Sequence, residues 1–142
     1  MSDLDATNLG RNLQYFKIDC EKPLTMLYFH GLWTGGGKGD TEDRLNQSRR
    51  IVEFARSLPG DFILAGGFNL MPDTESIKLL ESMNLRNLIK EYGVTNTRTS
   101  HYTKPEKFAD YIFITPGIKI QDFKVLRDEV SDHAPLYLDF TI

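Results

Sequence analysis

Two short apolar segments joined by one amphipathic helix constrain this fold more than any other feature of the sequence. Residues 24–30 form an apolar run that ends at His30, and residues 61–66 form a second run. Between them, from Thr41 to Leu58, apolar residues recur at the spacing of one helical face, and Pro59 with Gly60 follows. A strand, a crossing helix and a strand form a right-handed βαβ unit, which places both strands in one sheet. We therefore expect an α/β fold with a ligand-binding edge where these strands end.

The remaining segments extend this unit at both ends of the chain. Residues 12–19 lead through a turn into the strand at 24–30, which predicts an antiparallel hairpin. The other expected elements are two helical pieces at 72–84 and 85–92, an exposed loop at 94–107, and strands at 108–115, 118–126 and 134–141. We assign residues 1–10 to a loose lead-in segment and residues 11–142 to one domain.

The composition indicates a globular protein without a basic surface. Of its residues 40% are apolar, and its formal net charge is −3. This charge does not imply nucleic-acid binding, although local patches can override net charge, so a nucleic-acid partner stays open. The single Cys20 cannot form an internal disulfide, and the acidic N-terminus is not a secretory signal. With no apolar run long enough for a membrane span, we expect a cytoplasmic protein.

Polar residues stand where the predicted strands begin or end. His30 ends the first long apolar strand, Asn69 follows the second, Asp110 begins a later one, and Asp132 and His133 precede the last. Taken singly, each has a structural explanation as a rim residue, a turn residue or a strand cap. Their joint order favours a shared functional site. The glycine-rich loop 31–40 has neither the spacing nor the ending of a phosphate-binding P-loop.

The segments that contain these polar residues resemble the endonuclease/exonuclease/phosphatase superfamily of metal-dependent phosphoesterases, and the resemblance covers residues 10–142. The resemblance implies that Asp132 binds the metal, that His133 contacts the phosphate or activates water, and that Asp110 orients His133. It also implies that Asn69 positions the phosphate and that His30 contacts it or protonates the leaving group. The implied cofactor is Mg²⁺ or Mn²⁺, and the implied substrate contains phosphate.

The sequence departs from that superfamily at one catalytic position and in its extent. The family segment Gly-Asp-Phe-Asn reads Gly66, Gly67, Phe68 and Asn69 here, so Gly67 stands where the family has aspartate. The family's N-terminal half supplies an asparagine and a metal-binding glutamate that have no counterpart in this sequence. Because losing one preorganised catalytic group costs about 10²-fold or more in rate, we expect a phosphodiester or phosphomonoester hydrolase whose activity is weakened or lost.

The resemblance further implies the C-terminal half of a two-sheet α/β sandwich, with one mixed sheet, helices on its outer face and an open inner face. An uncovered apolar sheet face is unusual in a soluble monomer. We therefore expect a homodimer that covers it, since two-fold dimers are the commonest oligomers. Two alternatives stay open: a non-catalytic binding or structural module that assembles through this face, and a gene fragment or engineered chain without a separate function.

Overall fold

The computed structural model describes residues 11–142, so the expected lead-in at 1–10 lies outside the described residues. In chain order its elements are β1 (Leu13–Ile18), β2 (Leu24–His30), α1 (Glu42–Arg56), β3 (Asp61–Gly67), α2 (Glu75–Glu81), β4 (Arg86–Asn87), α3 (Leu88–Glu91), β5 (Asp110–Ile114), β6 (Lys119–Val125) and β7 (Leu136–Thr141). One mixed sheet has the order β1-β2-β3-β5-β4, and β6 pairs with β7 separately. None of the helices in this part of the chain is long and apolar enough to cross a membrane.

The βαβ unit expected from the sequence is confirmed. β2 and β3 pair in parallel, and their last residues, His30 and Gly67, lie side by side. α1 connects them, and the hydroxyl of Thr41 caps it by accepting a hydrogen bond from the backbone N–H of Arg44. The predicted hairpin is also confirmed, because β1 pairs with β2 in antiparallel register.

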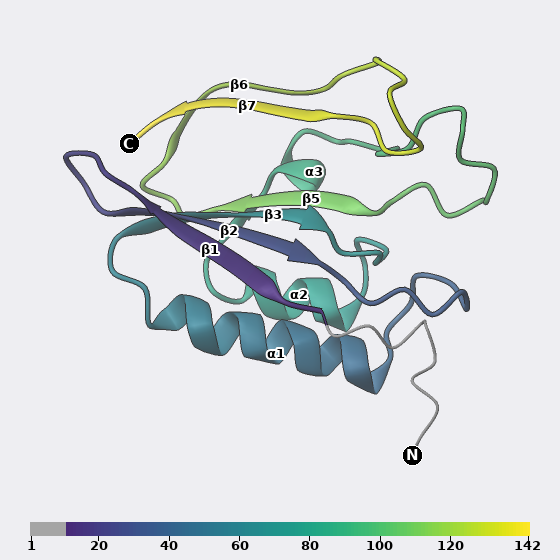
Figure 1. Ribbon diagram of the computed structural model, residues 1–142, viewed down its shortest axis with the longest axis horizontal. Helices are drawn as coiled ribbons and strands as arrows, with labels where there is room; N and C mark the ends of the chain where they lie inside the picture. The colour runs from purple at the N-terminus through teal and green to yellow at the C-terminus, as the bar shows by residue number, and fades with distance from the viewer. Residues whose placement is uncertain (1–10) are drawn as a thin grey trace.

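The helices α1 and α2 cover one face of the five-stranded sheet, and the β6–β7 hairpin lies over part of the other face (Figure 1). Leu27 and Phe29 of β2 are buried in the same apolar cluster as Ile51 of α1. The cluster continues through Leu64 of β3 and Phe113 of β5, which are fully buried. Removing this apolar surface from water, at about 25 cal/mol per Å², is the main force that holds helices and sheet together.

Residues 85–92 and the last two strands differ from the expected arrangement. The expected helical piece is instead the short strand β4 followed by the single turn α3. The side chain of Asn87 accepts a hydrogen bond from the N–H of Ile89 and starts that turn, because asparagine favours helix caps over helix interiors. β6 and β7 pair with each other rather than extending the main sheet. Strand periodicity identifies a strand but does not identify its partner.

Thr97 and Arg98, which we expected in an exposed loop, are buried. The backbone N–H of Thr99 donates to the carbonyl of Asp132, and that of Ala134 donates to the carbonyl of Thr97. Arg98 therefore lies opposite His133 in a short antiparallel bridge. This distant pairing buries a segment whose polar composition is typical of a surface loop.

The face of β1 and β2 that points away from α1 is apolar and exposed. Phe16 and Ile18 of β1 share this face with Tyr28 of β2, as the alternation of side chains and the pairing register require. Phe16 is 58% exposed and Tyr28 is 52% exposed. On the opposite face, Tyr15 of β1 contacts Phe54 of α1, with the ring centroids 5.0 Å apart. The predicted open inner face is thus present beside β1 and β2, while the β6–β7 hairpin packs on the remaining core.

Candidate functional site

Three adjacent strands bring His30, Gly67 and Asp110 into one row across the sheet. The parallel pairing of β2 with β3 sets His30 beside Gly67, and the antiparallel pairing of β3 with β5 sets Gly67 opposite Asp110. The row lies at the carboxyl ends of the two parallel strands, where open α/β sheets bind ligands. The sequence placed His30 and Asp110 at strand boundaries, and the structure brings these boundaries together.

A tight turn after β3 carries Asn69 to the same edge. Gly66 has a φ of +146°, and a Cβ added to it would lie 1.9 Å from the carbonyl oxygen of Phe29. Only glycine allows this close approach of two backbones. The backbone N–H of Asn69 donates to the carbonyl of Ala109, and its side-chain Nδ2 donates to the carbonyl of Gly31. The Asn69 side chain is therefore held in one orientation beside the row.

His133 and Asp110 form the central polar pair of the site. Nδ1 of His133 lies 2.8 Å from one carboxylate oxygen of Asp110 and 2.9 Å from the other. Because a carboxylate only accepts hydrogen bonds, Nδ1 donates to it; because a guanidinium only donates, Nε2 accepts from NH1 of Arg98. The backbone at Asp110 is fixed in turn by Thr97, whose hydroxyl oxygen accepts from the N–H groups of Ala109 and Asp110. This pair gives His133 a fixed tautomer and orientation.

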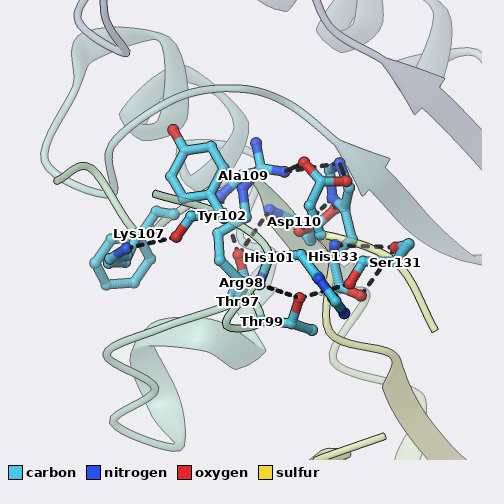
Figure 2. Close-up of polar contacts among 12 residues, drawn as sticks. Thr97, Arg98, Thr99, His101, Tyr102, Lys107, Ala109, Asp110, Ser131 and His133 are labelled. Carbon is cyan, nitrogen blue, oxygen red and sulfur yellow. Dashed lines mark hydrogen bonds and ion pairs between the residues drawn. The ribbon is translucent and has the colours of Figure 1, made fainter. Parts of the chain in front are cut away.

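Arg98 is a site residue that we did not predict from the sequence. Its side chain is only 5% exposed, and NH1 lies 3.0 Å from the carboxylate of Asp132 and 2.9 Å from Nε2 of His133. The guanidinium carbon lies 4.1 Å from the ring centroid of Tyr102, a cation–π contact. Figure 2 shows Arg98 beside Tyr102 and the Asp110–His133 pair. No local sequence signal indicated this role, because the polar segment around Arg98 lacks a strand period.

These residues surround an open cavity of about 390 Å³ at the sheet edge. The lining residues are Arg11, His30, Trp33, Asn69, Arg98, His101, Tyr102, Thr103, Lys104, Asp132 and His133. Four residues expected from the sequence thus line the cavity: His30, Asn69, Asp132 and His133. Asp110 and Gly67 do not line it, and Asp110 contacts His133. A larger groove of about 770 Å³ between β1 and α1 has mixed polar and apolar walls but no comparable set of histidines.

The cavity is rich in positive charge although the whole chain is acidic. Its lining includes the permanent cations Arg11, Arg98 and Lys104 but only one carboxylate, that of Asp132. NH1 of Arg11 lies 3.2 Å from Nδ1 of His30. Burial lowers the pKa of His30 below its ordinary value, and the charge of Arg11 lowers it further. Such surroundings favour an anionic ligand.

The glycine-rich loop 31–40 beside the cavity is anchored by Arg44. This buried guanidinium donates hydrogen bonds to the carbonyl oxygens of Leu32, Gly37 and Gly39. Its planar set of donors suits three carbonyls that surround it. The loop is therefore fixed from within by α1.

Lys38 extends this anchoring to the cavity wall. Its side chain is fully buried, and Nζ donates to the carbonyl of Phe108. Nζ also lies 4.8 Å from the ring centroid of Tyr102. Burial, followed by the nearby charge of Arg98, lowers the pKa of Lys38 to about 8. Lys38 and Arg98 thus both lie near the ring of Tyr102.

The donor groups at this edge do not fit a divalent cation. Within residues 11–142, no cluster of three or more histidine, cysteine, aspartate or glutamate side chains is placed to hold a metal ion. Asp132, the predicted metal ligand, is ion-paired with Arg98, and both oxygens of Asp110 contact His133. Mg²⁺ and Mn²⁺ favour several oxygen ligands, usually carboxylates and waters. The expected Mg²⁺ or Mn²⁺ therefore does not match the residues present, and Gly67 supplies no further ligand.

Comparison with known protein families gives one match over most of the chain. Residues 3–133 match the profile described as Endonuclease/Exonuclease/phosphatase family. A search of curated proteins finds no match to this sequence. The family match covers the segments that contain His30, Asn69, Asp110 and His133.

Solved structures with the same fold are distant in sequence. The mannosyl-6-phosphatase of Bacteroides thetaiotaomicron is 18% identical with a TM-score of 0.71, and the match covers 93% of this chain and 57% of that one. D. rerio TDP2 complexed with a single-strand DNA product is 17% identical with a TM-score of 0.67, covering 93% and 62%. The human Nocturnin catalytic domain with bound sulfate is 18% identical with a TM-score of 0.63, covering 92% and 52%. This chain thus spans little more than half the length of these solved chains.

Proposed function

Because this chain belongs to the endonuclease/exonuclease/phosphatase family, we propose that its cavity binds the phosphate group of a phosphorylated substrate and hydrolyses the ester only weakly. The Asp110–His133 pair carries this proposal, since it places a histidine of fixed tautomer in a cationic cavity. Asn69 and His30 line the same cavity and supply further contacts for phosphate oxygens. Charge-assisted hydrogen bonds to such oxygens are among the stronger polar contacts in proteins.

Two features limit hydrolysis at this site. Nε2 of His133, which would accept a proton from an attacking water, already accepts a hydrogen bond from Arg98. Gly67, in the middle of the row, offers no carboxylate to orient the water or the leaving group. The site therefore retains groups that can bind phosphate, but it lacks a carboxylate at position 67 that would assist hydrolysis of the ester.

Restoring a carboxylate at position 67 tests this proposal. A Cβ added to Gly67 would lie 3.4 Å from Oδ1 of Asp110 and 3.8 Å from Cδ2 of His30, so a side chain fits there. The assay compares the wild type with Gly67→Asp on chromogenic phosphomonoesters and phosphodiesters, with Mg²⁺, with Mn²⁺ and with EDTA. Gly39→Asp is the matched control, because a Cβ at Gly39 would meet no atom within 4 Å.

We expect Gly67→Asp to hydrolyse at least one substrate about 10²-fold faster than the wild type and the control. Equal rates in all three proteins would contradict the proposal that glycine at position 67 lowers the rate of hydrolysis. Failure of the wild type to bind any phosphate-containing probe would contradict the proposed function itself.

The net charge of the chain bears on the class of substrate. Solved structures with the same fold include a mannosyl-6-phosphatase and a protein complexed with a single-strand DNA product. The net charge of −3 favours a small phosphorylated molecule over a long nucleic acid.

Cys20 is exposed and unpaired, which suits the reducing cytoplasm as the proposed compartment.

A second candidate function is a non-catalytic module that assembles through the exposed face of β1 and β2. Phe16, Ile18 and Tyr28 form this face, and within residues 11–142 β1 is an edge strand with one unpaired side. The occupant we favour is a second copy of this chain, with residues 11–142 as one half-domain. The match covers 57% of the mannosyl-6-phosphatase chain, so a second copy would bring the assembly to a comparable size.

Sedimentation velocity at micromolar concentration tests this dimer. We expect a dimer for the wild type and a shift to monomer for Phe16→Asp, with the exposed Val130→Asp as the matched control. A wild type that sediments as a stable, folded monomer would rule out the dimer. Since the cavity belongs to one chain, phosphate binding by that monomer would leave the first proposal intact.

A further inference from the structure

Arg98 is a buried cation whose hydrogen-bonding capacity is only partly used. The side chain is 5% exposed, and its charge is paired with a single carboxylate, Asp132, that is itself half exposed. Its Nε is buried and has no hydrogen-bond partner within the described residues. The protein therefore does not use all the donors of this guanidinium, and Arg98 lines the cavity at the sheet edge.

The position of Arg98 is fixed before any ligand arrives. The guanidinium lies 4.1 Å from the ring centroid of Tyr102, and NH1 contacts both Asp132 and His133. Backbone hydrogen bonds on either side of Arg98 join its segment to residues 132–134. A planar guanidinium held in this way binds phosphate with little loss of conformational freedom.

The guanidinium of Arg98 is ion-paired with Asp132, the carboxylate that was expected to bind a divalent cation. A metal ion bound to Asp132 would lie close to NH1 of Arg98, which is 3.0 Å from that carboxylate. Two cations on one carboxylate repel each other, so the ion pair with Arg98 weakens metal binding at Asp132. Asp110 provides no alternative, since both of its oxygens contact His133.

We propose that Arg98 supplies the positive charge that holds phosphate in this cavity, so that the chain binds its ligand without a divalent cation. This inference rests on the proposed function, because it assumes that the cavity is a phosphate site. Arg98 and Asn69 would donate to phosphate oxygens, and Arg11 and Lys104 would add attraction from the rim. The inference departs from the metal dependence that the family resemblance implies.

Titration calorimetry with inorganic phosphate tests the inference on the wild-type chain. Titrations are run in EDTA and in millimolar MgCl₂ at the same ionic strength. We expect binding in EDTA, with an affinity that changes less than about threefold when Mg²⁺ is added. Binding that requires Mg²⁺ would overturn the inference and leave the proposed phosphate site standing. No binding in either buffer would overturn both.

Substitutions at Arg98 test the residue itself. Because hydrogen bonds to charged groups are stronger than those between neutral groups, Arg98→Met should weaken phosphate binding about tenfold or more in EDTA. Arg98→Lys keeps the charge but loses the planar donor set, so its affinity for phosphate should lie between those of the wild type and Arg98→Met. Arg49→Met is the matched control, since Arg49 is an exposed residue of α1 paired with Glu42.

Unchanged affinity in a folded Arg98→Met protein would overturn the assignment to Arg98. Circular dichroism and urea unfolding establish whether each variant is folded. If Arg98→Met does not fold, the wild-type comparison between EDTA and MgCl₂ still decides the question, because it needs no variant.

Discussion

Gly67 lies opposite Asp110 in the antiparallel pairing of β3 and β5, and a Cβ added to Gly67 would lie 3.4 Å from Oδ1 of Asp110. Its neighbour Gly66 differs in its backbone conformation and in the space available for a Cβ. Gly66 has a φ of +146°, and its added Cβ would lie 1.9 Å from the carbonyl oxygen of Phe29. One glycine is therefore required by the backbone, and the other occupies a position that a side chain can fill.

The first prediction compares alanine at these two adjacent positions. Gly66→Ala should destabilise the protein by about 3 kcal/mol or more, because it combines backbone strain with a clash against β2. Gly67→Ala should change the free energy of unfolding by less than about 1 kcal/mol. Urea unfolding of both variants measures the difference. Equal destabilisation would contradict the view that Gly67 is free to accept a side chain.

The second prediction concerns Thr97, which connects the site to the backbone. Its fully buried hydroxyl oxygen accepts from the N–H groups of Ala109 and Asp110. Thr97→Val keeps the shape but leaves both donors without a partner, so it should cost about 2–4 kcal/mol of stability. Thr97→Ser keeps the hydroxyl and should cost about 1 kcal/mol for the lost methyl group. If the two variants unfold at the same urea concentration, the hydroxyl does not hold this segment.

The βαβ unit and the functional edge could be predicted because their signals are local. The buried strand that ends at His30, the helical period of α1 and the polar residues at strand ends are each visible within a few positions. Parallel pairing then requires that the strand ends meet at one edge. The approach of His30 and Asn69 follows from this reasoning, whereas Asp110, Asp132 and His133 were expected at the site because of the family resemblance.

Arg98 could not be predicted in the same way, because its burial depends on pairing between segments far apart in the sequence. Thr97 and Arg98 belong to a polar run without a strand period, which is typical of an exposed loop. Only the bridge to His133 buries them. For the same reason, the strand pattern identified β6 and β7 but not their separation from the main sheet.

The third prediction concerns the protonation of His30. Burial lowers its pKa most, and the charge of Arg11 lowers it next. Arg11→Met removes that charge and should raise the pKa of His30 toward its ordinary value, as followed by the NMR shift of its Cε1 proton. The matched control is Arg49→Met, on the surface of α1. An unchanged titration of His30 in Arg11→Met would show that Arg11 has no electrostatic effect there.

The lowered pKa of His30 makes the stability of the fold depend on pH. Because the folded-state pKa of His30 is below its unfolded value, the unfolded chain binds more protons between these two values. This residue therefore destabilises the fold as pH falls through that interval. Arg11→Met should reduce this part of the acid destabilisation, as measured by the urea midpoint at several pH values.

The last prediction concerns Lys38, whose pKa is lowered to about 8, first by burial and then by Arg98. An unfolded lysine titrates near its ordinary value of 10.5. Between these two values the unfolded chain binds more protons than the folded chain, so stability from this residue rises with pH. The free energy of unfolding of the wild type, relative to Lys38→Met, should therefore increase from pH 8 to pH 10.

Lys78 provides the matched control for this measurement. It is exposed on α2 and paired with Glu75, which raises its pKa. The difference between the wild type and Lys78→Met should not rise over the same pH interval, because folding does not favour the neutral form of that lysine. Parallel curves for Lys38→Met and Lys78→Met would contradict the lowered pKa of Lys38. A rising difference for Lys38 alone would support a lysine whose charged form is disfavoured by burial and by the charge of Arg98.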